Sequence, residues 1–187
     1  VGFRRSYGIV YAPICQECSA CLAVRTVVEE FKPSVSQRRV LKFNKDVVVN
    51  EVTARATLEQ FDLFSKYQGS RHTGGDMATM EFYDYQALIE ETPVNTFVLE
   101  FRSSENLIGA CLVAVLADGL SALYSFFAPA DKRRSVGTQM VLTLIDIAMQ
   151  RGLPYVYLGY WVSGSQKMAY KYKFQALEYY EGLGWSP

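Results

Sequence analysis

The fold is decided by residues 96–127, which read TFVLEFRSSENLIGACLVAVLADGLSALYSFF. Two runs rich in Val, Leu and Phe, at 96–102 and 107–117, are separated by a short polar turn, which predicts an antiparallel hairpin. An Asp-Gly pair at 118–119 is typical of a tight turn between strands. Residues 121–127 are therefore predicted to add a third antiparallel strand.

The segment that follows predicts a helix and a return to the sheet. Ser135 can cap the helix, and apolar residues recur at helical spacing from Val136 to Ala148. Gly152 and Pro154 end it. Three further elements are predicted in order: a strand at 154–160, a short helix at 165–172 and a last strand at 174–180.

The first half of the chain predicts a similar mixture of elements. They are a strand near 22–28, a helix near 34–43, a strand near 46–52 and helices near 58–68 and 81–90. Since no repeat or Pro-rich linker separates the halves, residues 1–92 and 93–187 are expected to pack together. The prediction is an α/β fold of the α+β type, built as one mixed unit or as two small fused units.

Composition excludes several classes of protein. The 187 residues are 50% hydrophobic and 20% charged, which is typical of a folded chain with a sizeable core. The longest apolar runs are too short to cross a bilayer, so we expect no membrane-spanning segment and no membrane partner. His72 is the only histidine, so the sequence does not favour a hydrolase built on a His base.

The charge is balanced overall but unevenly distributed. Lys and Arg number 19, as do Asp and Glu. Basic residues gather at Arg4-Arg5 and within 32–45, 132–134 and 167–173. Such patches suit a phosphate backbone, although each is also compatible with an ordinary solvated surface.

The turn before the central helix has the features of a phosphate site. Arg134 to Gly137 lies where a strand passes to a helix N-terminus, and Arg133 precedes it. Unpaired amides, the positive helix end and neighbouring arginines all favour an anion. The motif is similar to the Arg-x-x-Gly turn of the GNAT acyltransferase fold, and the strand order predicted above fits that fold. The alternative is that Ser135 only caps the helix while the arginines are solvated.

A second basic pair lies on the predicted short helix. Lys167 and Lys171 are four residues apart and share one helical face. Two ammonium groups so placed repel each other unless an anion lies between them, which indicates a polyanionic partner. An exposed basic helix without a ligand is the competing interpretation.

Three cysteines near the N-terminus form a candidate metal site. Cys15, Cys18 and Cys21 follow the spacing C-x-x-C-x-x-C, close enough to ligate one zinc ion or an iron–sulfur cluster. Cys111 lies in a predicted apolar strand and is expected to be a buried core residue. Three free thiols remain the alternative.

Taken together, several stretches resemble the arginyl-tRNA–protein transferase family, and most closely its bacterial branch of aspartate/glutamate leucyltransferases. They occur in family order along almost the whole chain. They are 2–6 with Tyr11 and Pro13, the cysteine cluster, 31–42, 67–72, 124–127 with Pro129, 135–138, 157–161 and 167–171. Two departures are noted: a further cysteine segment of the family is expected before Val1, and Ser165 stands where many relatives carry Cys.

The resemblance implies a GNAT-like fold and a cytoplasmic aminoacyltransferase of the N-degron protein-degradation pathway. Its donor would be an aminoacyl-tRNA and its acceptor a protein with an N-terminal Asp or Glu. The branch favours leucine over arginine as the donated residue. Coenzyme A is not expected, and the chemistry requires no cofactor. A CoA-dependent acetyltransferase and a non-catalytic module that binds tRNA or a protein terminus are the alternatives.

The reaction assigns expected roles to particular residues. The acidic acceptor terminus needs a cation, which Arg4, Arg5 or Arg71 can supply. Tyr124 and Tyr160 are the candidates for proton transfer. The tRNA phosphates are assigned to the basic patches and the phosphate turn: Arg38, Arg39, Lys42, Arg133, Arg134, Gly137, Lys167 and Lys171.

Overall fold

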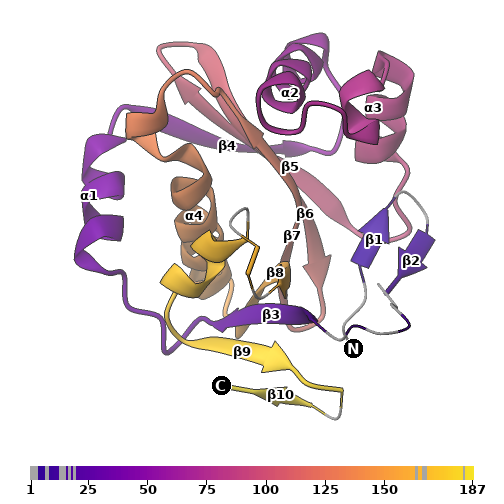
Figure 1. Cartoon of the computed structure of the whole chain (residues 1–187). Coiled ribbons are helices and arrows are strands. Elements are labelled where there is room, and N and C mark those ends of the chain that lie inside the picture. Colours follow the sequence, from indigo (N-terminus) through magenta and orange to yellow (C-terminus); the bar gives the residue numbers. More distant parts are fainter. Residues whose placement is uncertain are drawn as a thin grey trace.

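The structure is a computed structural model that describes residues 4–6, 9–12, 16, 18, 20–162, 164–165, 168–182 and 184–187. Its centre is an eight-stranded sheet in the order β10-β9-β3-β8-β7-β6-β5-β4 (Figure 1). Neighbouring strands are antiparallel except β7 and β8, which are parallel. A separate hairpin joins β1 to β2.

The bounds of the elements agree closely with the sequence pattern. The strands are β1 (Arg4–Ser6), β2 (Ile9–Tyr11), β3 (Cys21–Val27), β4 (Val47–Thr53), β5 (Thr96–Ser103), β6 (Asn106–Leu116), β7 (Gly119–Phe127), β8 (Tyr155–Val162), β9 (Leu177–Tyr180) and β10 (Trp185–Ser186). The helices are α1 (Val35–Phe43), α2 (Leu58–Arg71), α3 (Phe82–Glu90) and α4 (Val136–Gln150), with 3-10 turns η1 (Asp76–Thr79), η2 (Lys132–Arg134) and η3 (Ala169–Lys173). The α/β prediction is confirmed, as are the three antiparallel strands followed by a helix and another strand. The structure adds that this strand, β8, is parallel to β7.

Strands from both halves of the chain share this one sheet. β3 and β4 come from residues 1–92: β3 lies between β8 and β9, and β4 forms the edge of the sheet beside β5, so both pair with strands of the second half. The described residues thus form one mixed unit rather than two fused ones. The division near residue 92 stays a prediction.

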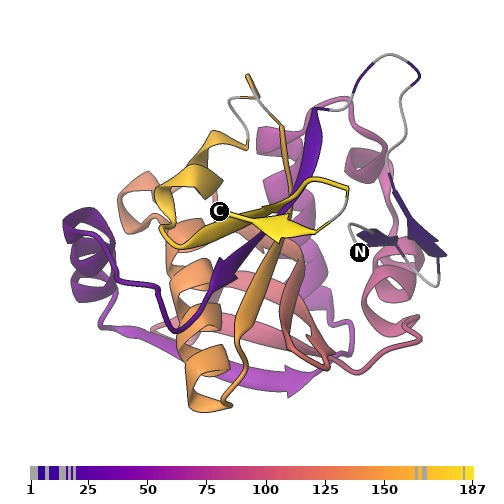
Figure 2. The ribbon, with the colours of Figure 1, turned by 90° about the horizontal axis from the view of Figure 1, so that it is seen from below.

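Helices cover both faces of the sheet, and each face has its own core. Figures 1 and 2 show α1 and α4 on one face and α2 and α3 on the other. Met140 and Leu144 of α4 pack into one core with alternate residues of β5, such as Leu99. Phe64 of α2 packs into the second core, where Val98 faces the other way from the same strand. Successive side chains of a strand point to opposite faces, and here both faces are buried, so the sequences of the central strands are continuous apolar runs.

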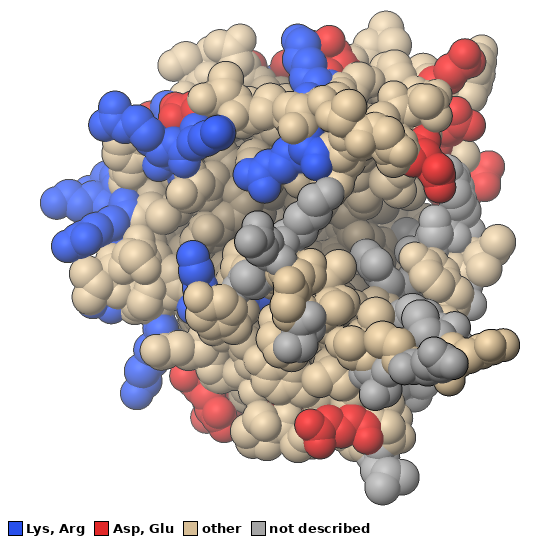
Figure 3. Space-filling view, viewed as in Figure 1, with Lys and Arg blue, Asp and Glu red and all other residues tan. Residues whose placement is uncertain are grey.

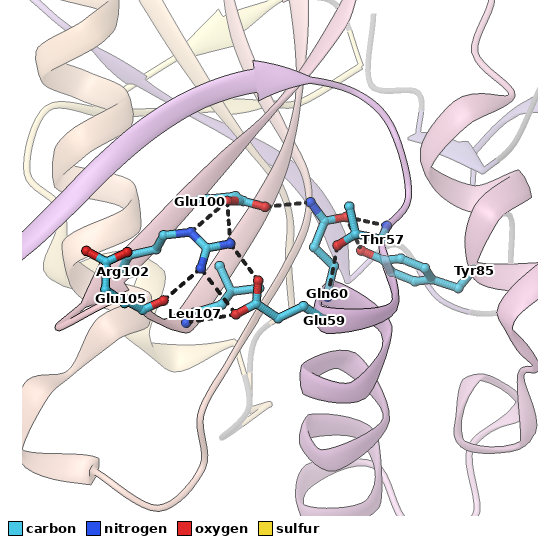
Figure 4. A network of polar contacts seen from close by, with 8 residues as sticks. All are labelled: Thr57, Glu59, Gln60, Tyr85, Glu100, Arg102, Glu105 and Leu107. Atoms are coloured by element: carbon cyan, nitrogen blue, oxygen red, sulfur yellow. Dashed lines mark hydrogen bonds and ion pairs between the residues drawn. The ribbon is translucent and has the colours of Figure 1, made fainter.

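A buried polar network holds α2 against β5 (Figure 4). Gln60 donates its side-chain amide to Glu100 Oε1 at 2.8 Å and accepts from the hydroxyl of buried Tyr85 at 3.2 Å. Arg102 bridges the carboxylates of Glu100 and Glu59. Because buried polar groups are stable only when paired, this network fixes how α2 lies on the sheet.

Three expectations need correction. In the described residues, the short helix expected at 165–172 is the 3-10 turn η3 (Ala169–Lys173). Ser135 occupies the N-cap position of α4, but its left-handed backbone (φ 48°) leaves the hydroxyl without a capping hydrogen bond. The last strand begins at Leu177 rather than 174, because Phe174 turns inward, 1% exposed, and Ala176 has a φ of 57°. In the described part of the chain, no helix has the length and apolar character needed to cross a bilayer.

Candidate functional site

The two parallel strands at the centre of the sheet separate shortly after they pair. Pairing runs from Gly119–Tyr155 to Ser121–Tyr157. Directly beyond this pairing, β7 contains one extra residue, Leu123, relative to β6. At the same level, the pairing of β8 with β3 shifts register, and Gly159 of β8 has a φ of 75°. Bulges bend strands and interrupt their ladders, so both strands turn away from each other at the same level. Figure 3 shows the molecular surface hollowed near the central strands of Figure 1.

The end of β7 brings the predicted phosphate turn close to the predicted acceptor cation. A Cβ atom on Gly137, in the first turn of α4, would lie 3.0 Å from the ring of Phe127. Phe127 also packs on Tyr67 of α2, at 5.0 Å between ring centroids. The guanidinium of Arg71 lies 5.4 Å from the same Phe127 ring. Gly137, predicted to contact the tRNA donor, and Arg71, predicted to bind the acceptor, thus lie near the same aromatic ring.

Gln68 and Tyr124 form a polar pair inside the α2 face of this region. Gln68 is 1% exposed, and its amide donates to the hydroxyl of Tyr124 and approaches the sulfur of Met77. Among the described residues, no donor reaches Gln68 Oε1. Burial raises the pKa of neighbouring Tyr67. Tyr124, predicted for proton transfer, is therefore held in one orientation by a buried amide.

Tyr160 and Lys171 meet at the far end of β8. Tyr160 is 5% exposed and Lys171 7% exposed, and the Lys171 ammonium donates to the carbonyl oxygen of Tyr160. A Cβ on Gly159 would lie 3.8 Å from Lys171 Nζ. The expected exposed basic face at Lys171 is therefore wrong, because its side chain turns inward onto β8. Its role toward tRNA stays a prediction.

Arg134 is bound by protein carboxylates. Its guanidinium donates two parallel hydrogen bonds to Asp46, both 2.9 Å, and lies 3.3 Å from the carboxylate of Asp131. These hydrogen bonds hold the pKa of the Asp46 carboxyl well below its usual range. Asn44 also donates to the Arg134 carbonyl at 2.7 Å. Arg134 thus joins the start of α4 to the end of α1, and its charge is balanced within the protein.

The other predicted tRNA contacts of the N-terminal half come together on one surface. Arg38, Arg39 and Lys42 are exposed on α1, and Arg133 is exposed on η2. Arg133 lies 5.7 Å from the ring of Phe43 at the end of α1, which connects the two segments. Figure 3 shows many basic side chains gathered over this side of the molecule, whereas acidic ones are most prominent at the upper right and along the lower edge.

Several predicted residues lie outside what the structure describes. Cys15 and Lys167 are among them, and the side chains of Arg4 and Arg5 on β1 are as well. Cys18 is exposed and Cys21 half-buried at the start of β3. Within the described residues, no group of three metal-ligating side chains is found, so the metal site stays a prediction.

Sequence reasoning missed three residues that organise this region. Gln68, Phe127 and Asp46 were not singled out, although each contacts a predicted residue. Gln60 and Gln68 share a helical face with the buried Phe64, at spacings of four residues. A polar residue on an apolar stripe is a usable signal for a buried hydrogen bond. Contacts such as Arg134–Asp46, 88 residues apart, leave no such local signal.

Comparison with known proteins identifies relatives over the whole chain. The sequence model described as "Arginine-tRNA-protein transferase, C terminus" matches residues 59–181, and the corresponding N-terminal model matches residues 1–39. An aspartate/glutamate leucyltransferase of Paramagnetospirillum magneticum is 50% identical over 185 residues, covering 98% of this chain and 76% of that protein. One of Gluconacetobacter diazotrophicus is 50% identical over 187 residues, covering 100% and 72%.

Solved structures share the fold at low sequence identity. FemX aligns with a TM-score of 0.59 and 10% identity, over 92% of this chain and 62% of that one. L-PGS from Bacillus licheniformis aligns with a TM-score of 0.59 and 9% identity, over 81% and 50%. These likenesses support the fold alone, whereas the sequence matches establish kinship: the chain belongs to the arginine-tRNA-protein transferase family.

Proposed function

We propose that this chain transfers leucine from charged tRNA to the α-amino group of proteins that begin with Asp or Glu. The observation that carries this proposal is the 50% identity, over nearly the whole chain, to proteins named aspartate/glutamate leucyltransferase. Charged tRNA is a cytoplasmic substrate, so the reaction is placed in the cytoplasm.

The reaction is aminolysis of an activated ester. The neutral acceptor amine attacks the carbonyl carbon of the aminoacyl ester and forms the new C–N bond. The bond between that carbon and the ribose oxygen breaks, and the proton lost by the amine finally resides on the ribose oxygen. Since the ester is already activated, holding both reactants in line supplies much of the rate, and no cofactor is needed for the chemistry.

The region around the separated strands suits these requirements. The α4 N-terminus and Arg71 both lie against the ring of Phe127, so donor and acceptor groups are expected to approach each other there. Arg71 is exposed and suits the acidic side chain of the acceptor. Tyr124 and Tyr160 remain the proposed proton-transfer groups. A metal at the cysteine cluster remains a separate proposal.

A CoA-dependent acetyltransferase gains no support from the geometry of the phosphate turn. Arg134 would have to leave Asp46 and Asp131 before its charge could serve a pyrophosphate. The Arg134 side chain therefore serves here as a structural junction between α1 and α4. A non-catalytic binding module would bind tRNA without moving the aminoacyl group.

The proposal is tested by following radiolabelled leucine, and separately arginine, from charged tRNA to peptides that begin with Glu, Asp or Ala. Label from leucyl-tRNA on the acidic peptides alone is expected. Arg71→Gln should raise the KM for the Glu peptide about tenfold or more, because a charge-assisted hydrogen bond is lost. Arg55→Gln removes an exposed cation elsewhere and should behave like the unaltered protein. Transfer from neither tRNA by folded protein would refute the proposal.

A further inference from the structure

Among the described side chains, the exposed cations that form no ion pair are concentrated on one side. Among the described side chains, Arg25, Lys66, Arg102, Arg134 and Arg151 form ion pairs. Most other exposed cations lie on α1, directly beside it or on η2: Lys32, Arg38, Arg39, Lys42, Lys45, Lys132 and Arg133. Arg55, Arg71 and Lys173 lie elsewhere. The segregation is visible in Figure 3.

Helical periodicity places the basic residues of α1 on its outward face. Gln37 and Asn44, each 3% exposed, mark the inward stripe. At 3.6 residues per turn, Arg39 and Lys42 fall opposite that stripe, and Arg38 lies beside Lys42. Arg38, Arg39 and Lys42 are exposed on this face, so they are available to a partner.

Two buried amides fix how α1 is presented. Gln37 donates to the carbonyl of Lys173 in η3 at 3.1 Å, and Asn44 donates to the carbonyl of Arg134 in η2 at 2.7 Å. The helix is therefore attached at both ends to segments of the C-terminal half. Arg134 pairs with both nearby carboxylates, Asp46 and Asp131, so this group leaves one net negative charge against the seven cations of the surface.

An exposed aromatic ring lies within this basic surface. Phe43 is 49% exposed at the end of α1, and the guanidinium of Arg133 lies 5.7 Å from its ring. Exposure of an aromatic ring costs free energy that burial against a partner recovers. A ring beside guanidinium groups suits a ribose or a base next to phosphates.

We propose that α1 and η2 form the surface that binds the double-helical stem of the tRNA. Resting on the proposed function, this inference adds Phe43 and Lys132 to the contacts and leaves Arg134 and Lys171 out of them. Exposed cations on a rigid helix contact phosphates rather than bases, and proteins recognise double-stranded RNA chiefly by its shape and backbone. The stem therefore lies along α1, while its single-stranded 3′ end continues to the hollow at the sheet.

The test measures binding of a hairpin with the acceptor stem of tRNA-Leu, by fluorescence anisotropy between 50 and 300 mM KCl. The double variant Arg39→Gln, Lys42→Gln should weaken binding and reduce the slope of log K against log salt by about 2, roughly 1 for each phosphate contact. Phe43→Ala should weaken binding without changing the slope. Arg55→Gln is the matched control and should leave both unchanged.

Two results would overturn the inference: a wild-type slope in the double variant, or a single-stranded 3′ tetranucleotide competing as well as the hairpin. Leucyl transfer measured in parallel separates the two proposals. If the unaltered protein transfers no leucine but its hairpin binding depends on Arg39 and Lys42, the proposed function fails and this surface stands. If transfer occurs and the double variant keeps the wild-type KM for leucyl-tRNA, this surface is wrong and the function stands.

Discussion

Replacing Gln60 by Met should destabilise the protein strongly, because one amide serves three partners in the network of Figure 4. The substitution keeps the side chain's length and helix propensity. It removes the hydrogen bond to the Glu100 carboxylate at 2.8 Å, and it removes the oxygen that accepts from the Tyr85 hydroxyl at 3.2 Å and from the Thr57 backbone N–H at 3.3 Å. A hydrogen bond to a charged group contributes about 1.5–3 kcal/mol, and an orphaned buried hydroxyl costs about 1–3 kcal/mol.

The expected loss is therefore about 4 kcal/mol in the free energy of unfolding, which lowers the melting temperature by roughly 8–16 °C for a chain of this size. Urea and thermal unfolding followed by circular dichroism measure it. Tyr85→Phe is the control and should cost only about 1 kcal/mol, because Gln60 keeps its bond to Glu100. A loss below about 1 kcal/mol for Gln60→Met would show that the network does not anchor α2.

Two further predictions concern single side chains. Since the pKa of Asp46 is lowered in the folded state, its ion pair with Arg134 stabilises the fold above the unfolded-state pKa of about 4 and progressively less as pH falls below it. The stability difference between wild type and Asp46→Asn, from urea unfolding, should therefore shrink from pH 6 to pH 3; a constant difference would contradict the ion pair. Burial raises the pKa of Cys111 to about 11, so iodoacetamide at pH 8 should label exposed Cys18 in the native protein and leave Cys111 unlabelled, as read by peptide mass spectrometry. Equal labelling of both would show that the Cys111 environment opens.

Local sequence signals were sufficient for most of the elements. The strands of 96–127 and helix α4 occur where apolar spacing and turn residues predict them. The capping pairs Ser34–Gln37 and Thr57–Gln60 start α1 and α2 as their sequences suggest. These features depend on residues a few positions apart, so the chain carries them without its tertiary fold.

The resemblance to the transferase family likewise came from the sequence, because collinear motifs record kinship whatever their contacts. Individual roles were harder to assign. Arg134 and Lys171 read alike as basic residues beside helical segments, yet one is bound to Asp46 and the other turns inward to Tyr160. Whether a cation faces a ligand or the protein depends on groups that arrive from distant segments.

By itself, the sequence determined the order of strands and helices, the family, and which stretches are basic. Only the tertiary structure decided where β7 and β8 separate, that Phe127 lies near Gly137 and Tyr67, and that α1 presents its cations beside η2. The physical reason is range: hydrophobic periodicity and capping act within one or two turns. Charge pairing, burial and strand register are instead settled between residues that folding alone brings into contact.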